Sequence, residues 1–220
     1  KSKETIIRYS RQIIHFLREQ QVKAIVIACN TASAFALDAV KDELDIPVLG
    51  VIEAGARVAA EETHNKRVGV IGTLGTVGSG IHEAFLKHLD PEITVIGKAC
   101  PLFVPLVEEG WLHDPVTTEV ASRYLQELKQ QEIDTLILGC THYPIFDELI
   151  RNEFSYDVNL INTGACIAEK VEKYLKENEM ENTQEIKMSK IVITKDEKDF
   201  DFKAKNILKS TRTLDITRFN

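Results

Sequence analysis

An internal repeat is the feature that most constrains how this chain can fold. Residues 17–29 align without gaps on residues 128–140, and each copy ends in a cysteine after a short apolar run. The identical positions are the leucines, Gln20 with Gln131, and the two cysteines, while nearly every other apolar position matches in kind. A second similarity follows in the same order, between 55–59 and 164–168, and both segments begin Gly-Ala. Two matches in one order predict a duplicated structural unit.

Apolar runs alternate with amphipathic segments along the chain. The run at 24–28 is continuous, which is typical of a strand buried on both faces. The patterns predict strands at 24–28, 46–52, 67–72, 93–97, 135–139, 158–161 and 191–194. They predict helices at 5–20, 35–44, 53–63, 117–130, 165–176 and 200–208, with a further helix ending near 89. The alternation indicates an α/β fold with mainly parallel sheets.

The repeat divides this fold into two pseudo-symmetric α/β domains. We expect the first domain to comprise 1–53 plus 163–220, and the second to comprise 54–162. The second cysteine strand is preceded by a strand-turn-helix-strand unit at 67–97, and the first has no counterpart to it. Repeat logic places the start of the missing unit about 45 residues before Lys1. The first domain is therefore expected to lack its N-terminal strand-turn-helix unit.

Charge and cysteine content restrict the class of partner. A formal net charge of −7 argues against nucleic acid, because phosphate binding needs a basic surface. No apolar run approaches the roughly 20 residues of a membrane helix, and residues 1–5 carry no apolar signal region. The four cysteines form no CxxC pair, which favours reduced thiols and a cytoplasmic location.

Cys29 and Cys140 are the residues that point to chemistry. Each ends a predicted strand and precedes a predicted helix, and ligands bind at the carboxyl ends of parallel strands. Asn30, Thr31 and Ser33 are suitable caps for the helix after Cys29. Amide groups at a helix start favour an anion and lower the pKa of a nearby thiol.

Two thiols on opposite sides of one carbon could invert it. If the two halves face each other, one thiolate removes the α-proton and the other thiol delivers a proton to the opposite face. His142, two residues after Cys140, is placed to tune that thiol.

Other interpretations of these motifs are weaker. The glycine-rich stretch 72–80 lacks both nucleotide-binding registers, so we expect a loop that shapes the substrate pocket. Cys29, Cys140 and His142 could hold zinc, but one residue between ligands is an unusual spacing. Cys100 and Cys166 are expected in the core. Surface positions are expected for His64, His82, His88 and His113.

The two cysteine motifs, Ala28-Cys29-Asn30-Thr31-Ala32 and 138–144 (Leu-Gly-Cys-Thr-His-Tyr-Pro), carry a specific resemblance. Through them the sequence resembles the glutamate racemases of the aspartate/glutamate racemase family. The similarity extends over essentially the whole chain, including 47–51, 69–73 and 100–110. The Asp-Ser-Gly and Pro-Tyr-Gly motifs with which the family opens are not among these residues.

The resemblance implies an active-site cleft between the two domains, no cofactor and no metal. It implies that Cys29 and Cys140 are the catalytic acid/bases, Cys29 acting on the D-enantiomer and Cys140 on the L-enantiomer. His142 is a further catalytic candidate, as is Glu108, with Glu109 as the alternative to Glu108. The implied substrate-binding residues are Asn30, Thr31, Thr73, Thr76, Thr141 and His142.

The expected reaction is therefore the interconversion of L- and D-glutamate, which supplies D-glutamate for peptidoglycan and hence for cell-wall biogenesis and cell shape. The expected partner is the small-molecule substrate, and a homodimer is one option for assembly. Two alternatives stay open. The chain could be a racemase of aspartate or another amino acid with the same fold, or a catalytically incomplete binding fragment.

Overall fold

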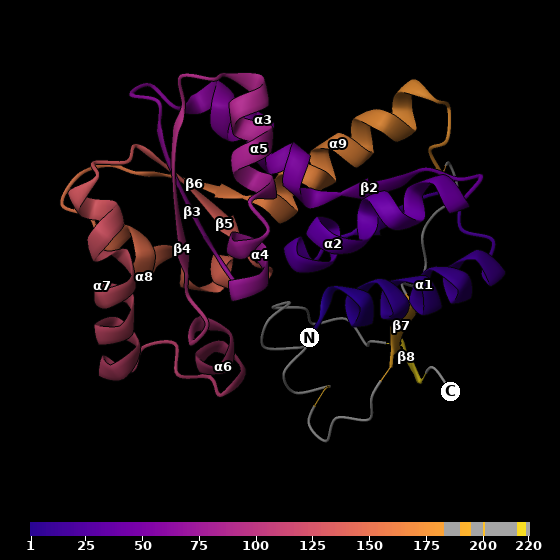
Figure 1. Ribbon diagram of the computed structural model, residues 1–220. Helices are drawn as coiled ribbons and strands as arrows, with labels where there is room; N and C mark the ends of the chain where they lie inside the picture. The colour runs from indigo at the N-terminus through magenta and orange to yellow at the C-terminus, as the bar shows by residue number, and fades with distance from the viewer. Residues whose placement is uncertain (183–189, 195–199, 201–214, 219–220) are drawn as a thin grey trace. The chain divides into compact units, whose positions relative to one another are not determined.

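Helices and strands alternate along the chain in the order that the sequence predicts. The computed structural model describes residues 1–182, 190–194, 200 and 215–218 (Figure 1). The helices are α1 (Lys3–Glu19), α2 (Asn30–Val40), η1 (Lys41–Glu43), α3 (Val51–Glu62), α4 (Leu74–Gly78), α5 (Ile81–Leu89), α6 (Phe103–Glu108), α7 (Pro115–Gln130), η2 (Tyr143–Phe146), α8 (Asp147–Asn152) and α9 (Thr163–Glu177). The strands are β1 (Ile25–Ile27), β2 (Val48–Gly50), β3 (Arg67–Gly72), β4 (Thr94–Ala99), β5 (Thr135–Gly139), β6 (Asn159–Asn162), β7 (Lys190–Ile193) and β8 (Asp215–Arg218).

Residues 1–178 form one compact unit around a four-stranded sheet. The strand order is β4-β3-β5-β6, and every pairing is parallel. Side chains alternate between the two faces, so Val68 and Val70 pack with α3 and α5, whereas Ile71 packs with α7. Helices thus cover both faces, as Figure 1 shows for α7 on one side and for α3 and α5 on the other. The expected α/β class with parallel sheets is confirmed.

The strand before Cys29 is less buried than its apolar sequence predicts. β1 pairs in parallel with β2 in a two-stranded sheet, and Val26 is 39% exposed. The expectation of burial on both faces is therefore wrong at this position, because helices of the described chain do not cover that face of β1. On the covered face Ile14 of α1, Ile25 and Val40 of α2 form a small core.

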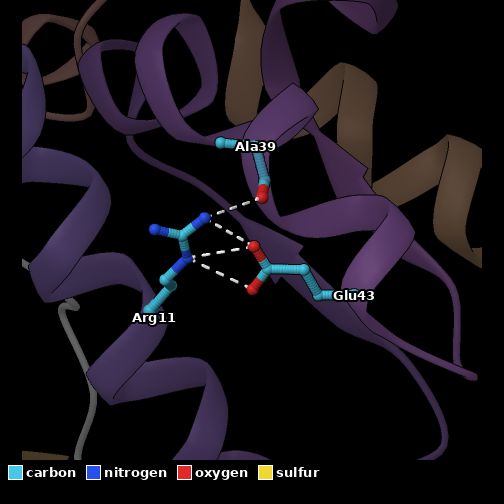
Figure 2. A network of polar contacts seen from close by, with 3 residues as sticks. All are labelled: Arg11, Ala39 and Glu43. Atoms are coloured by element: carbon cyan, nitrogen blue, oxygen red, sulfur yellow. Dashed lines mark hydrogen bonds and ion pairs between the residues drawn. The ribbon is translucent and has the colours of Figure 1, made fainter.

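A polar network also joins α1 to the end of α2 (Figure 2). The Arg11 guanidinium binds the Glu43 carboxylate through two nitrogens, Nε at 3.0 Å and Nη2 at 2.5 Å from Oε1. Nη2 also donates to the carbonyl oxygen of Ala39 at 3.4 Å. Arginine suits this role because its planar fork matches a carboxylate and reaches a carbonyl at the same time. The network is exposed, so it orients α1 more than it stabilises the fold.

Helix boundaries differ from the predicted ones at the two motifs. The helix expected at 35–44 begins at Asn30, with Cys29 as its N-cap residue and no side-chain cap. Ser33 does not cap it, because its hydroxyl donates to the carbonyl of Ile27 and accepts from the amide of Val51. The glycine-rich stretch is not a loop throughout, since it contains α4, which the Thr73 hydroxyl caps by accepting from the Thr76 amide. The short helix α6 was not predicted, whereas the helix expected after Cys140 is present as η2 followed by α8.

The repeat is visible in part. In each half the cysteine strand pairs in parallel with the strand that follows it, β1 with β2 and β5 with β6. The Gly-Ala similarity does not mark equivalent positions. Gly55 is the fifth residue of α3, whereas Gly164 is the second residue of α9.

Residues 179–220 form a second unit in which β7 pairs in parallel with β8. The strand predicted at 191–194 is present as β7. The helix predicted at 200–208 lies outside the described residues apart from Phe200. The division into 1–53 plus 163–220 and 54–162 stays a prediction. In the part of the chain that the structure describes, no helix is both long and apolar enough to cross a bilayer.

Candidate active site

The order in which the chain connects the four strands of the sheet predicts where a ligand would bind. From β3 the chain first adds β4 on one side and later adds β5 on the other. Such a switch point leaves a crevice at the carboxyl ends of the two strands. Gly72 and Gly139 pair at the carboxyl ends of β3 and β5. Thr73 and Cys140 directly follow them, so two of the predicted site residues lie at the switch point.

The two thiols have unlike surroundings. Cys29 is exposed, at the start of α2, whereas Cys140 is 9% exposed. Burial raises the pKa of the Cys140 thiol, and negative charge on Cys29 and on Glu108 raises it further. Hydrogen bonds from the His142 backbone and the Thr141 hydroxyl act in the opposite direction on that pKa. Asn30, which follows Cys29, is linked through Thr163 to the carbonyl of Leu138, two residues before Cys140, so the fold brings the two cysteine motifs close together although 110 residues separate the thiols in the chain.

A thiol, an imidazole and a carboxylate follow one another beside β5. Nδ1 of His142 lies 3.9 Å from the Cys140 Sγ and 3.4 Å from the Thr141 hydroxyl. Nε2 of the same ring lies 3.3 Å from an oxygen of Glu108, the last residue of α6. The structure therefore places Glu108 in contact with His142. Glu109 instead lines a surface hollow with Leu106 and Trp111.

Three threonine hydroxyls join the segment after Cys29 to the segment after β3. Thr31 Oγ1 lies 2.9 Å from both Thr73 Oγ1 and Thr76 Oγ1, and the latter two are 3.1 Å apart. A hydroxyl can donate once and accept twice, so the three contacts use all three hydroxyl hydrogens, and the capacity that the triangle keeps is for accepting hydrogen bonds. The predicted binding residues Thr31, Thr73 and Thr76 are thus brought together.

Asn30 is 2% exposed and uses both ends of its side chain within the protein. Its Nδ2 donates to Thr163 Oγ1 at 3.1 Å, and its Oδ1 lies 3.1 Å from Nε2 of His82. The second hydrogen on Nδ2 is left for another acceptor. A role of Asn30 in substrate binding stays a prediction.

His82 was expected at the surface, and that prediction is wrong. The side chain is 3% exposed, and burial lowers its pKa to about 4. The sequence held a signal for this, because His82 stands four residues before the buried Leu86 and therefore shares its helix face. Thr163 was also missed. Its signal is its place directly after β6, the strand that neighbours β5.

Gly139 brings the strand before Cys140 close to its neighbours. A methyl group on Gly139 would lie 2.6 Å from the Ile71 carbonyl oxygen and 3.5 Å from Nε2 of His82. A glycine is needed here because no larger residue fits without a backbone shift.

The other two cysteines have structural surroundings. Cys100 is fully buried, as expected, and burial raises its pKa to about 12. Cys166 is half-buried and packs against the cores around α3 and α9. Across the described ranges, no three histidine, cysteine or acidic side chains gather closely enough to hold a metal ion.

Comparison with known proteins gives one consistent result. The family profile described as Asp/Glu/Hydantoin racemase matches residues 2–171. A glutamate racemase of Geobacter metallireducens is 47% identical over 180 residues, which are 82% of this chain and 67% of that protein. Two crystal structures match this chain over its whole length, and the match covers 82% of the crystallised chain in each case. They are a glutamate racemase isoform of Bacillus anthracis (TM-score 0.95, 32% identity) and the Francisella tularensis glutamate racemase in complex with D-glutamate (TM-score 0.92, 34% identity).

The matched residues include both cysteine motifs and the whole four-stranded sheet. The chain therefore belongs to the Asp/Glu/Hydantoin racemase family, and within it to the glutamate racemases.

Proposed function

We propose that this chain interconverts L- and D-glutamate by proton transfer between the substrate and two thiols, with no cofactor. The observation that supports the proposal is the hydrogen-bonded link from Asn30, beside Cys29, through Thr163 to Leu138 in the strand before Cys140, because it holds the two cysteine motifs close together at the carboxyl ends of parallel strands. Such an arrangement supplies one acid/base for each face of a substrate carbon.

The reaction needs no change of oxidation state. With D-glutamate bound, the Cys29 thiolate takes the α-proton, and the Cα–H electron pair stays on the substrate as an enolate-like carbanion. The Cys140 thiol then gives its proton to the opposite face, which leaves L-glutamate, a Cys29 thiol and a Cys140 thiolate. The reverse direction exchanges the two roles.

Polar groups around the thiols suit these steps. We assign His142 the role of a proton-accepting partner for Cys140, with Glu108 orienting the imidazole ring. A hydroxyl of Thr31 or Thr73 can donate to a substrate carboxylate if it turns its hydrogen from the triangle to the ligand, and a donor there stabilises the charge that develops on the carboxylate. Thr141 and Asn30 complete the proposed binding set.

Glutamate is favoured over aspartate as the substrate. The relatives described above are glutamate racemases, and one of them was crystallised with D-glutamate. A racemase of this kind supplies D-glutamate for peptidoglycan, and it needs reduced thiols, a condition that the cytoplasm provides. Two-domain organisation with a cleft, cytoplasmic location and homodimer formation stay predictions.

Hydrogen-deuterium exchange tests the proposal directly. L- and D-glutamate are each incubated with the protein in deuterated water, and loss of the α-proton signal is followed by proton NMR. We expect exchange from both enantiomers, with D-enantiomer exchange lost in Cys29→Ser and L-enantiomer exchange lost in Cys140→Ser. Cys166→Ala, which alters a thiol outside the site, should leave both rates unchanged. If wild-type protein exchanges neither enantiomer, the proposal is wrong for this chain.

A further inference from the structure

A chain of buried hydrogen bonds connects the segment after Cys29 with the strand before Cys140. His82 Nε2 lies 3.1 Å from Asn30 Oδ1, and Asn30 Nδ2 donates to Thr163 Oγ1 at 3.1 Å. The Thr163 hydroxyl donates in turn to the carbonyl oxygen of Leu138 at 3.4 Å. None of the three polar side chains is more than 3% exposed. The first residue of α2 is therefore tied to β5 through groups that do not touch solvent.

The direction of each hydrogen bond follows from the donors available. Asn30 directs its NH₂ group to Thr163, so its oxygen faces His82 and must accept. Nε2 of His82 therefore carries the hydrogen, and Nδ1 carries a lone pair. This Nδ1 is buried, and the described residues offer it no hydrogen-bond partner. The low pKa of about 4 keeps the ring neutral at neutral pH.

The unpartnered Nδ1 distinguishes His82 from a residue that only fills space. A buried acceptor without a partner destabilises the folded protein, and an apolar side chain of similar volume would avoid that penalty. A histidine in this place is explained if its other nitrogen has a task. That nitrogen faces Asn30, and it also lies 3.5 Å from the place where a Cβ on Gly139 would stand. The ring thus contacts Asn30, the neighbour of Cys29, and lies close to Gly139, the neighbour of Cys140.

We propose that His82 is a positioning residue that holds Asn30, and through it Cys29, in register with Cys140. The inference rests on the proposed two-thiol reaction. Asn30 directly follows Cys29, so movement of its side chain is transmitted to the thiol through one peptide unit. Small displacements of reacting groups are costly, since a shift of about 1 Å can reduce a rate about a hundredfold. Because the link acts on the Cys29 side, its loss should affect D-glutamate more than L-glutamate.

Three variants test the role in exchange kinetics. His82→Leu removes the donor at similar bulk, and His82→Gln restores an N–H near the position of Nε2. Leu86→Val disturbs the same face of α5 without touching Asn30. We expect His82→Leu to lower kcat for α-proton exchange from D-glutamate by about tenfold or more, with little change in KM. The loss for L-glutamate should be smaller, and His82→Gln should recover most of the D-glutamate rate.

Leu86→Val should lower both enantiomers' rates equally, if at all, because a general loss of stability reduces the amount of active protein without favouring one face. Equal loss for both enantiomers in His82→Leu would overturn the inference. If His82→Leu does not fold, Thr163→Val removes the other partner of Asn30 at nearly constant volume. It should then produce the same bias against D-glutamate, and no bias would again overturn the inference.

A second measurement does not depend on glutamate as substrate. Iodoacetamide labelling of the folded protein, read by mass spectrometry of peptides, gives the ratio of the Cys29 and Cys140 reaction rates. We expect His82→Leu to lower this ratio and His82→Gln to restore it. An unchanged ratio would count against the link. A changed ratio in a protein that does not racemise glutamate would support the positioning role while showing the proposed function to be wrong.

Discussion

At the scale of single residues, the site depends on unequal surroundings for equal side chains. Cys29 is exposed and Cys140 is buried, so desolvation acts mainly on the second thiol. The sequence presents both cysteines in the same setting, at the end of an apolar run. The two thiols differ in burial and charge environment because of neighbours that are distant in the chain, such as Glu108 and the residues around β5. Sequence spacing does not predict which of these neighbours lie beside each thiol.

The contrast between Glu108 and Glu109 leads to a first prediction. Glu108→Gln removes the carboxylate that lies 3.3 Å from Nε2 of His142, so the imidazole loses its charged partner. We expect kcat for L-glutamate to fall about tenfold to a hundredfold, which is less than the roughly 10²–10⁴-fold of a group that transfers the proton itself, because Glu108 acts through His142. Glu109→Gln is the matched control and should retain wild-type rates. Steady-state racemisation assays measure both, and equal losses in the two variants would contradict the assignment.

His82 leads to a prediction about stability and pH. Its pKa is about 4 in the folded protein and about 6.5 when unfolded, so the unfolded chain takes up the proton first. The stability that the protein has with His82 neutral in both states is fully present above about pH 6.5. It is lost as the pH falls toward 4, because protonation of this histidine then favours the unfolded chain. By that point the free energy of unfolding should have dropped by about 3 kcal/mol on account of this group.

Denaturant titrations at pH 7, 5.5 and 4 measure this loss. His82→Gln should lack this part of the pH dependence, because glutamine does not titrate. If the free energy of unfolding changes with pH by the same amount in the wild-type protein and in His82→Gln, burial of His82 is not the cause of the pH dependence.

At the scale of elements, close approach of helices decides the packing. α3 meets α9 at Gly55, where a methyl group would lie 2.7 Å from Cγ2 of Thr163. Thr163 also belongs to the hydrogen-bonded chain behind the site, so this packing and the site share a residue. Sequence periodicity predicted the positions of α3 and α9 nearly correctly. The internal repeat aligned Gly55 with Gly164, because a sequence pattern does not indicate which residue lies at the helix crossing.

Gly55→Ala should therefore destabilise the protein by about 1–3 kcal/mol, as overpacking usually does. Gly78→Ala is the control in another helix, since a methyl group there meets nothing within 4 Å. That control should be neutral or stabilise the protein by up to about 1 kcal/mol, because alanine favours helix. Thermal and urea unfolding of both variants provide the comparison. Equal stability of the two would contradict the crossing as the cause.

At the scale of the whole molecule, ligand binding should appear as stability. Groups from α2, α4 and β5 meet around the thiols, so a bound substrate joins segments that are distant in sequence. A ligand at a hundred times its Kd raises the free energy of unfolding by about 2.7 kcal/mol. We expect D-glutamate to raise Tm by several degrees in a saturable manner and D-aspartate to have a smaller effect at equal concentration. Equal shifts would favour a broader amino-acid specificity.

The sequence by itself determined the α/β class, most element positions and the pair of cysteine motifs. Local patterns suffice for these because apolar periodicity reflects which residues face the core, and because Cys29 and Cys140 each follow a recognisable apolar run. The family resemblance was also carried by contiguous residues, from 28–32 and 138–144.

Tertiary structure alone decided the rest. The order β4-β3-β5-β6 creates the switch point, and pairing between strands far apart in the chain leaves no mark in a single sequence. The burial of His82, its bond to Asn30, and the contact of Glu108 with His142 follow from side chains that meet across elements. A contact of this kind depends on helix rotation and strand register together, which local residue patterns do not encode.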